Sequence, residues 1–437
     1  MAVANPLDRT DEQKAICEMV RQFADEQIIP NAEHYDSTDT YPEPIVEQLK
    51  ELGLFGLTIP EEYGGLGLSV EHQRAFTAES APYDMPFSLN VPTLGILAAT
   101  LVEFGTHEQK ARHLPAILRG EELWVQFLSE PSGGSDLAGC LTRADRDGGE
   151  FRLNGSKIWS SAAFASDYAM CLARTNWDVP KHRGLTMFIL KIHQPGVTVE
   201  QIRQVDGTLE FCQEFFDDVV MPLGDVVGEV DDGWNVASRL LIHERMAVGG
   251  GSPYTSGRSI GHDSAAVDTS VIDTVRATGL EGDAHARQLV AEAHVRQLVG
   301  GHLVRRVTEG MTCGAMPPPA GSLMKLFSAT AVMRRSEIGL EVAGATAAAW
   351  PDDAPTAGGR VGLDSLSRQG VSLGGGSNEI QRNIIAERLL GMPREAAADR
   401  EIPYRDVRRG AWGPRRRRRV RRSAPRHRPW PARSRHR

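Results

Sequence analysis

The residues best suited to chemistry begin in the segment FLSEPSGGSDLAG, at positions 127–139. Its start has the composition of a strand, and the loop that follows combines hydroxyl groups with small residues: Ser129, Ser132, Gly133, Gly134 and Ser135. Because small residues leave backbone N–H groups accessible, such a loop suits a phosphate group or the polar edge of a ring. The alternative is a loop that binds nothing, which this composition does not exclude.

A second segment, KIWSSAAFASD at positions 157–167, places Trp159 directly before Ser160 and Ser161. An indole can stack on a flat ring while neighbouring hydroxyls hydrogen-bond to the edge of that ring. The alternative is a tryptophan that belongs to the protein core.

A third segment, LGGGSNEIQRNIIAERLLGMPRE at positions 373–395, has three glycines before a predicted helix. The first turn of that helix contains Ser377, Asn378 and Glu379. The first N–H groups of a helix have no partner within it, so they can face an anionic or carbonyl ligand. Taken alone, the segment is a helix with a glycine-rich entry.

Two kinds of element must position these residues. Residues 1–122 are predicted to form an N-terminal helical domain, because their apolar residues recur at helical spacing. Proline and glycine mark the ends of helices expected over 44–52 and 92–104. Residues 123–230 contain short β-rich runs separated by turn residues, which predicts a middle β domain. Within it, Asn154-Gly155 predicts the turn of a hairpin.

Residues 231–395 are predicted to form a C-terminal helical bundle, since their long helical runs have apolar faces. The segment 249–283 is rich in Gly, Ser and Asp and is expected to be a loop with one short helix. The predicted fold class is therefore α+β with several domains. Strands and helices do not alternate and no GxGxxG motif follows a strand, so a Rossmann domain that binds NAD is not expected.

The net charge of −8 combines two different parts of the chain. Residues 408–437 contain fourteen arginines and no acidic residue, which leaves 35 basic against 57 acidic residues, a charge of −22, for residues 1–407. We predict that residues 396–437 form an Arg-rich tail that is disordered from about residue 408. Arginine runs contact phosphates without sequence preference. Nucleic-acid or anionic-surface binding through this tail is one functional alternative, and a solvated extension is the favoured interpretation.

The five cysteines are far apart and form no CxxC or His/Cys pattern, so we expect neither a metal site nor a disulfide framework. No apolar run reaches the roughly 18 residues of a membrane helix. The charged N-terminus lacks the pattern of a signal or transit peptide. These features predict a cytoplasmic protein that does not bind a membrane.

Five further segments complete a larger pattern: IPEEYGGLG (59–67), EFGTHEQKARHLPAILRGE (103–121), FFDDVVMP (215–222), GEVDDGW (228–234) and GSLMKLF (321–327). All eight segments, in this order and spacing, resemble the acyl-CoA dehydrogenase family over about residues 10–407. The resemblance implies an N-terminal helical domain, a middle β domain and a C-terminal four-helix bundle. It also implies assembly as a homotetramer or as a heterotetramer with a paralogue.

The resemblance implies a flavoprotein of fatty acid or lipid catabolism, as in β-oxidation, that uses FAD to convert an acyl-CoA to the trans-2-enoyl-CoA. A base removes the α-proton while the β-hydride moves to the flavin, and an electron-transfer flavoprotein then accepts the electrons. An unactivated α C–H is too weak an acid for a carboxylate base, so hydrogen bonds to the thioester carbonyl must raise its acidity. In the family these come from a flavin ribityl hydroxyl and one backbone N–H.

Carried over by position, the residues implied to bind the cofactor are Leu128, Ser129, Gly134, Ser135, Trp159, Ser161, Ser377 and Glu379. Those implied to contact the substrate are Ser135, Arg245 and Gly374. The family's Arg-x-x-Phe-Gly segment, which reaches the FAD of a neighbouring subunit, has no clear match. Residues 285–289 occupy its region, and Arg287 is expected to take a related role.

The base is where this sequence departs from many family members. Those members have a catalytic glutamate at the position of Gly375, which can offer only its backbone N–H to the thioester carbonyl. A second group in the family has its base on an earlier helix, just before an arginine, and Glu244 in LIHERMAVGGG matches that position. We therefore predict Glu244 as the base. The alternative is a structural glutamate paired with Arg245 or another neighbour, while His243 lies about 100° round the helix and is expected to pack or face solvent.

Three other functions remain open at this stage. Gly375 motivates a catalytically incomplete subunit of a heterotetrameric acyl-CoA dehydrogenase. A flavin monooxygenase or oxidase on the same fold would react with oxygen instead of a flavoprotein. Binding through the Arg-rich tail is the alternative from a different class. Gly375 and the 249–283 loop also favour a bulky or branched acyl group as substrate.

Overall fold

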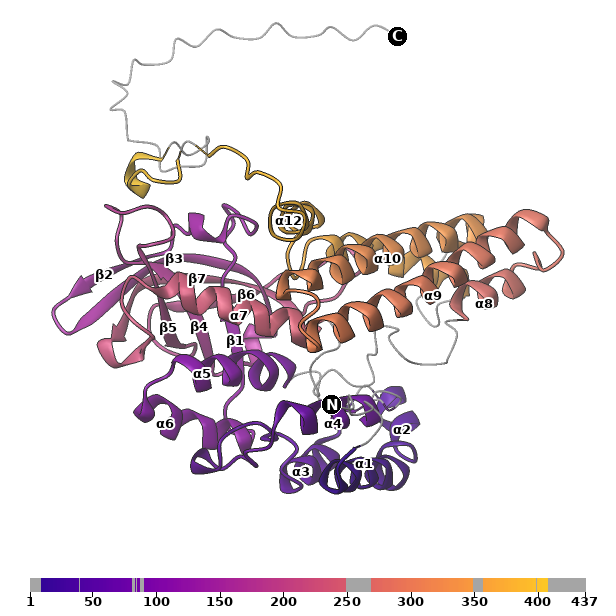
Figure 1. Cartoon of the computed structure of the whole chain (residues 1–437), viewed down its shortest axis with the longest axis horizontal. Helices are drawn as coiled ribbons and strands as arrows, with labels where there is room; N and C mark the ends of the chain where they lie inside the picture. The colour runs from indigo at the N-terminus through magenta and orange to yellow at the C-terminus, as the bar shows by residue number, and fades with distance from the viewer. Residues whose placement is uncertain are drawn as a thin grey trace, which may run out of the picture.

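The computed structural model describes residues 9–407 except 39, 81–82, 84, 87–89, 249–268, 349–356 and 398. A β-sheet lies between two helical parts (Figure 1). The indigo and purple N-terminal helices cover one side of the sheet, and the long orange helices extend away from its end. The predicted disorder from residue 408 onward lies outside the described residues.

The N-terminal part is helical, as predicted. Its elements are α1 (Asp11–Phe23), η1 (Ala24–Ile28), α2 (Ala32–Thr38), α3 (Glu43–Glu51), η2 (Glu61–Tyr63), α4 (Val70–Ser80), η3 (Pro92–Ala98), α5 (Ala99–Phe104) and α6 (His107–Leu118). Thr10 and Thr106 begin α1 and α6 with capping boxes, each accepting from the backbone N–H three residues on. The helix predicted over 92–104 is one continuous run, with π-helical winding in η3 and α-helical winding in α5.

The middle part is one eight-stranded sheet among the described residues, with order β6-β7-β3-β2-β4-β5-β8 and with β1 parallel to β4. The strands are β1 (Trp124–Phe127), β2 (Arg143–Asp147), β3 (Glu150–Ser161), β4 (Tyr168–Arg174), β5 (Leu185–Lys191), β6 (Val197–Gln201), β7 (Phe211–Pro222) and β8 (Val226–Val227). Alternate residues of β4 enter two cores. Met170 and Leu172 pack with the N-terminal helices, while Cys171 joins the core on the other face.

The hairpin predicted at Asn154-Gly155 is wrong. Residues 150–161 form the single strand β3, and the chain reverses before it, between β2 and β3, at Gly148 and Gly149. Gly155 has a different purpose: a Cβ there would lie 2.7 Å from the Cα of Thr142. The glycine therefore permits close passage of two backbones at a β-bulge and does not form a turn.

The C-terminal part is helical, with α7 (Gly233–Val248), α8 (Ser270–Ala277), α9 (Ala284–Thr312), η8 (Pro318–Ala320), α10 (Gly321–Ala343), η9 (Gly344–Ala348), α11 (Ala357–Ser367), η10 (Arg368–Ser372), α12 (Asn378–Ile384), η11 (Ile385–Leu389) and η12 (Tyr404–Asp406). The long α10 packs against α8, α9, α11 and α12, while α7 packs on η3, α5 and β5. The short helix predicted within 249–283 is α8, and 249–268 lie outside the described residues. In the part of the chain that is described, no helix combines the length and apolarity needed to cross a bilayer.

Candidate active site

Glu244 lies on the buried face of α7. It follows Leu240 by four residues and precedes Ala247 by three, and both of these are fully buried. Burial raises the pKa of the Glu244 carboxyl, and a hydrogen bond with Gln126 and the charges of Arg245 and Lys325 only partly oppose this effect. A half-buried carboxyl with a raised pKa is suited to accept a proton.

Gln126 comes to Glu244 from β1. It shares a strand face with Trp124, which packs in the core formed with the helices. Its Oε1 is buried and has no hydrogen-bond partner among the described residues. Sequence reasoning missed this residue, because a single glutamine in a strand carries no local signal.

Lys325 contacts the glycine-rich segment, and its charge acts on the pKa of the predicted base. From α10, its Nζ donates to the Val371 carbonyl oxygen at 2.5 Å. Burial lowers the pKa of Lys325, and the charge of Glu244 acts in the opposite direction. A Cβ on Gly375 would lie 3.5 Å from the Lys325 Cε. Lys325 therefore lies against Gly375, and its charge and that of Glu244 act on each other's pKa. The sequence had not singled out this lysine.

The glycine-rich segment is held in a conformation that requires glycine. Gly375 and Gly376 have φ values of 67° and 91°, in the left-handed region. The buried Gln381 donates from Nε2 to both of their carbonyl oxygens, at 3.2 and 3.1 Å. The Gly374 N–H is taken by the Gly370 carbonyl at 2.9 Å, whereas no described residue accepts the Gly375 N–H. Gly375 therefore offers a backbone donor, and Gly374 does not.

The loop after β1 is fixed by a buried ion pair. Lys157 Nζ lies 3.0 Å from Glu130 Oε1 and donates to the Leu128 carbonyl at 3.0 Å. Burial would raise the pKa of Glu130, but the Lys157 charge and hydrogen bonds from Cys140, Leu141 and Thr142 hold it at about 2. The loop that carries the predicted cofactor residues is thus anchored at its first turn.

The predicted cofactor residues of this loop differ in exposure. Leu128 is buried, while Gly134 and Ser135 are exposed. Ser129 is half-buried, and a Cβ on Gly134 would lie 3.3 Å from its Oγ. The small residues therefore leave the outer side of the loop open to a ligand.

Trp159 is an exposed ring at a strained position. It sits at the second irregularity of β3, has φ of 70°, and leaves 55% of its surface exposed. Phe211 meets it edge-on, with 6.0 Å between ring centroids. Ser161 is also exposed, whereas Ser160 is buried and lies 3.1 Å from Glu214 Oε2. The interpretation of Trp159 as a core residue is therefore wrong, and its free ring face suits a flat ligand.

The predicted cofactor side chains at the start of the final helix are engaged in contacts within that helix. Ser377 is the N-cap of α12, and its hydroxyl accepts the Ile380 N–H at 3.3 Å. Glu379 is exposed and pairs with Arg382 at 3.4 Å. These side chains therefore have local partners.

The remaining predicted residues lie on α7 and α9. Arg245 is half-buried and donates from Nε to the Leu241 carbonyl at 2.9 Å. Burial lowers its pKa, and Arg388 of η11 lowers it further. His243 lies 3.0 Å from Glu103 on the other side of the helix. Arg287, exposed at the start of α9, contacts the Glu281 carbonyl at 3.5 Å, and this contact does not involve the other predicted site residues.

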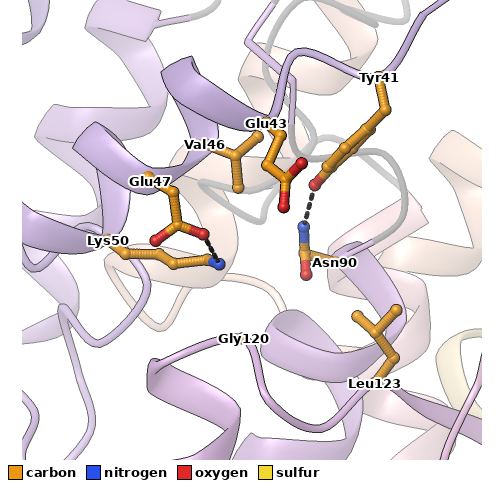
Figure 2. Close-up of a pocket in the computed structure, with 8 residues that line it drawn as sticks. All are labelled: Tyr41, Glu43, Val46, Glu47, Lys50, Asn90, Gly120 and Leu123. Atoms are coloured by element: carbon orange, nitrogen blue, oxygen red, sulfur yellow. Dashed lines mark hydrogen bonds and ion pairs between the residues drawn. The ribbon is translucent and has the colours of Figure 1, made fainter.

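A hollow of about 150 Å³ lies elsewhere, in the N-terminal part (Figure 2). Its walls include the Lys50–Glu47 ion pair at 2.6 Å and the Asn90–Tyr41 hydrogen bond at 3.2 Å. None of the predicted site residues lines it. It is also smaller than the ~300 Å³ at which ligand pockets usually begin, so it does not enter the functional argument.

Comparison with protein families matches three successive models to the chain. Residues 10–121 match the N-terminal domain of acyl-CoA dehydrogenases, residues 126–219 the middle domain and residues 231–390 the C-terminal domain. Together they span most of the described chain, in the order seen in the fold.

Individual relatives agree with this result. The acyl-CoA dehydrogenase IpdE1 of Mycobacterium tuberculosis is 36% identical over 350 residues, covering 80% of this chain and 88% of the relative. Among solved structures, the Tcur3481-Tcur3483 steroid acyl-CoA dehydrogenase is 26% identical with a TM-score of 0.72, covering 90% of this chain and 100% of the other. The ChsE4-ChsE5 complex of M. tuberculosis is 27% identical with a TM-score of 0.67, covering 89% and 100%.

Proposed function

Since the chain belongs to the acyl-CoA dehydrogenase family of oxidoreductases, we propose that it catalyses the FAD-dependent α,β-dehydrogenation of an acyl-CoA to the trans-2-enoyl-CoA. The observation that carries this proposal is Glu244, a carboxyl with a raised pKa that shares Lys325 with the Gly375 loop. An electron-transfer flavoprotein is the proposed electron acceptor.

The residues present fit a flavin. Trp159 offers an exposed ring face, and the hydroxyls of Ser129 and Ser161 and the open Gly134 loop lie on neighbouring strand ends. Bound FAD would supply the hydride acceptor. The contribution of the chain is to hold the ring through Trp159 and to meet its polar edge through the serines.

The proton is assigned to Glu244. As the α C–H bond breaks, its proton passes to a Glu244 carboxylate oxygen. The hydride lost from the β-carbon as the double bond forms would need the acceptor that bound FAD supplies. A carboxylate with a raised pKa is a stronger base than an exposed one, because water stabilises its charge less. Gln126 of β1 hydrogen-bonds to the carboxyl and would orient it.

Gly375 is assigned to the thioester carbonyl. Its N–H has no acceptor among the described residues, and Gln381 holds the segment by its carbonyl oxygens. A fixed N–H aimed at the thioester oxygen would stabilise the negative charge that develops there as the α-proton leaves. A glycine here also keeps a second carboxylate out of the site, so the charge of the base is not opposed by a like charge.

The acyl group proposed is bulky or branched. Gly375 presents no side chain, and a structural relative of the same family is named a steroid acyl-CoA dehydrogenase. Straight-chain acyl-CoAs of different lengths belong in the same panel as branched and polycyclic ones, so that the preference is measured directly.

The test is flavin bleaching under anaerobic conditions with this acyl-CoA panel. Wild type is expected to bleach with at least one thioester, and Glu244→Gln is expected to lose at least ~1,000-fold in rate because an amide cannot accept the proton. Glu309→Gln, an exposed glutamate on α9, is the matched control and is expected to bleach as wild type does. Equal bleaching by Glu244→Gln would show that another group is the base.

A second proposal concerns assembly. We infer that the chain works in a heterotetramer with a paralogue, in preference to a homotetramer. Two structural relatives are named as paired proteins, Tcur3481-Tcur3483 and ChsE4-ChsE5, and Val295, Leu298 and Val299 leave apolar side chains exposed along α9. Light scattering and FAD content of the chain, alone and co-expressed with a paralogue, test this. A tetramer of this chain alone, with full FAD content and bleaching, would contradict it.

A further inference from the structure

In Figure 1 the yellow chain runs from α12 toward the sheet. Its last described residues, 399–407, lie beside the sheet and are here called the C-terminal strap. The Tyr404 N–H donates to the Val179 carbonyl at 2.9 Å, and the Arg405 N–H donates to the Trp177 carbonyl at 3.0 Å. The strap is therefore bonded to the loop between β4 and β5, although it lies beyond residue 390, where the family match ends.

Tyr404 is the centre of the contact, and only 4% of its surface is exposed. Its ring stacks on Trp177, with 5.6 Å between centroids and an angle of 21°. The Arg174 guanidinium lies over its ring, 3.9 Å from the centroid. Its hydroxyl donates to the Gly139 carbonyl. Gly139 ends the turn η4 (Leu137–Gly139), which closes the loop that carries the predicted cofactor residues.

Arg174 holds the same turn from the sheet. Its side chain is fully buried, donating to the Ala138 carbonyl at 2.6 Å and to the Cys140 carbonyl at 3.1 Å. A buried guanidinium is costly unless its N–H groups are bonded and its charge is compensated. The Ala138, Cys140 and Lys181 carbonyls accept from Nε and Nη2 of this guanidinium. The rings of Tyr404 and Trp177 lie beside its charge, so the turn, the arginine and the strap stabilise one another.

A second chain of contacts reaches the loop next to Ser135. Asp136 accepts from Lys181 Nζ at 2.9 Å, and Asp399 of the strap lies 3.9 Å from the same nitrogen. Lys181 therefore sits between one carboxylate from the loop and one from the strap. The strap thus bonds directly to Gly139 and reaches Asp136 through Lys181.

We propose that the C-terminal strap positions residues 129–139 for the cofactor, with Tyr404 and Arg174 as positioning residues that touch neither cofactor nor substrate. This inference rests on the proposed FAD site, because that loop is its open wall. Without the strap, η4 loses its hydroxyl donor and the ring beside Arg174. The loop then loses conformational entropy when FAD binds, and this lowers the affinity for FAD.

The test uses the full-length chain with Tyr404→Phe, which removes only the hydroxyl, and Tyr404→Ala, which also removes the ring. FAD is stripped and titrated back, and hydrogen exchange of residues 129–139 is measured in the FAD-free protein. We expect the dissociation constant of FAD to rise about fivefold for Tyr404→Phe and at least ~20-fold for Tyr404→Ala. Exchange of 129–139 is expected to accelerate in the same order, while exchange of β5 stays at the wild-type rate.

Two controls separate this role from general damage. Tyr41→Phe removes a tyrosine hydroxyl bonded to Asn90 in the N-terminal part, and deletion of 408–437 leaves the strap intact. Both are expected to match wild type. Unchanged exchange and unchanged FAD affinity in both Tyr404 variants would overturn the inference. If Tyr404→Ala does not fold, FAD affinity and exchange of residues 129–139 in Tyr404→Phe and Lys181→Met test the role of the strap. A wild type that binds no FAD refutes the proposed function, and the exchange measurement still decides the role of the strap.

Discussion

Replacing Lys157 by methionine would leave a charged carboxylate buried without a counter-charge. The Lys157 side chain is 0% exposed, that of Glu130 is 5% exposed, and 3.0 Å separates Nζ from Oε1. Loss of one partner from a buried pair of this kind costs about 3–5 kcal/mol of unfolding free energy, because the remaining charge has lost its solvation and its partner. The same change removes the donor to the Leu128 carbonyl, so the loop that begins at Ser129 should loosen.

The pKa of Glu130 gives an independent magnitude. It stands at about 2 against an ordinary 4.5, which corresponds to about 3 kcal/mol of stabilisation. Because the folded-state pKa is the lower one, this contribution is fully present above about pH 4.5 and is lost as the pH falls toward 2. Lys157→Met should therefore lower stability at pH 7 and should flatten this part of the acid dependence.

The assay is urea unfolding of wild type, Lys157→Met, Glu130→Gln and the double variant at pH 7. A coupling energy of at least ~2 kcal/mol is expected, with the double variant more stable than Lys157→Met. The matched control is the pair Arg152–Glu150 on β3, which is as close at 2.7 Å but about one-third exposed. Its coupling should stay below ~1 kcal/mol. Equal coupling energies for the Lys157–Glu130 and Arg152–Glu150 pairs would show that burial does not strengthen the ion pair.

Three further changes test the site. Lys325→Met removes a positive charge that lowers the pKa of Glu244, so the pH at which the flavin-bleaching rate rises should increase. Lys325→Arg keeps the charge and should leave that pH unchanged. The same pH in both variants would exclude electrostatic coupling between Lys325 and Glu244. Gly375→Ala places a Cβ on a left-handed backbone near Lys325, so thermal unfolding should show about 1 kcal/mol less unfolding free energy. The control Gly370→Ala has nothing within 4 Å of its Cβ and no positive φ, so its unfolding free energy should fall less. Trp159→Ala should weaken FAD binding at least ~10-fold with little change in melting temperature, because its ring is mostly exposed; a large drop in melting temperature would restore the core interpretation.

The fold was largely predictable because its signals are local. Helical spacing, β-rich runs and eight ordered motifs indicated the helical, β and helical parts, and the family match confirms them. Asn154-Gly155 misled because the same dipeptide that favours a turn also permits close backbone passage, and only the neighbouring Thr142 distinguishes the two.

The site was predictable only in part, since its key contacts are long-range. Glu244 was identified from its place before an arginine, and its role stays a prediction that burial supports. Gln126, Lys325 and Tyr404 were missed, because each contacts the site from an element distant in sequence. No local pattern marks such a residue: Gln126 and Lys325 act on the Glu244 pKa from β1 and α10, and Tyr404 bonds to Gly139 across 265 residues.

The strap also sets an order of events during synthesis. Tyr404 and Gly139 are separated by 265 residues, so the donor to the proposed cofactor loop is synthesised long after the loop itself. At ~5–20 residues per second, the ribosome adds it roughly 13–50 s later. A chain that ends after η11 and before Tyr404 would contain all three helical and β parts and would still lack the donor to Gly139. Under the proposed role of the strap, such a truncated product would bind flavin more weakly than the finished chain.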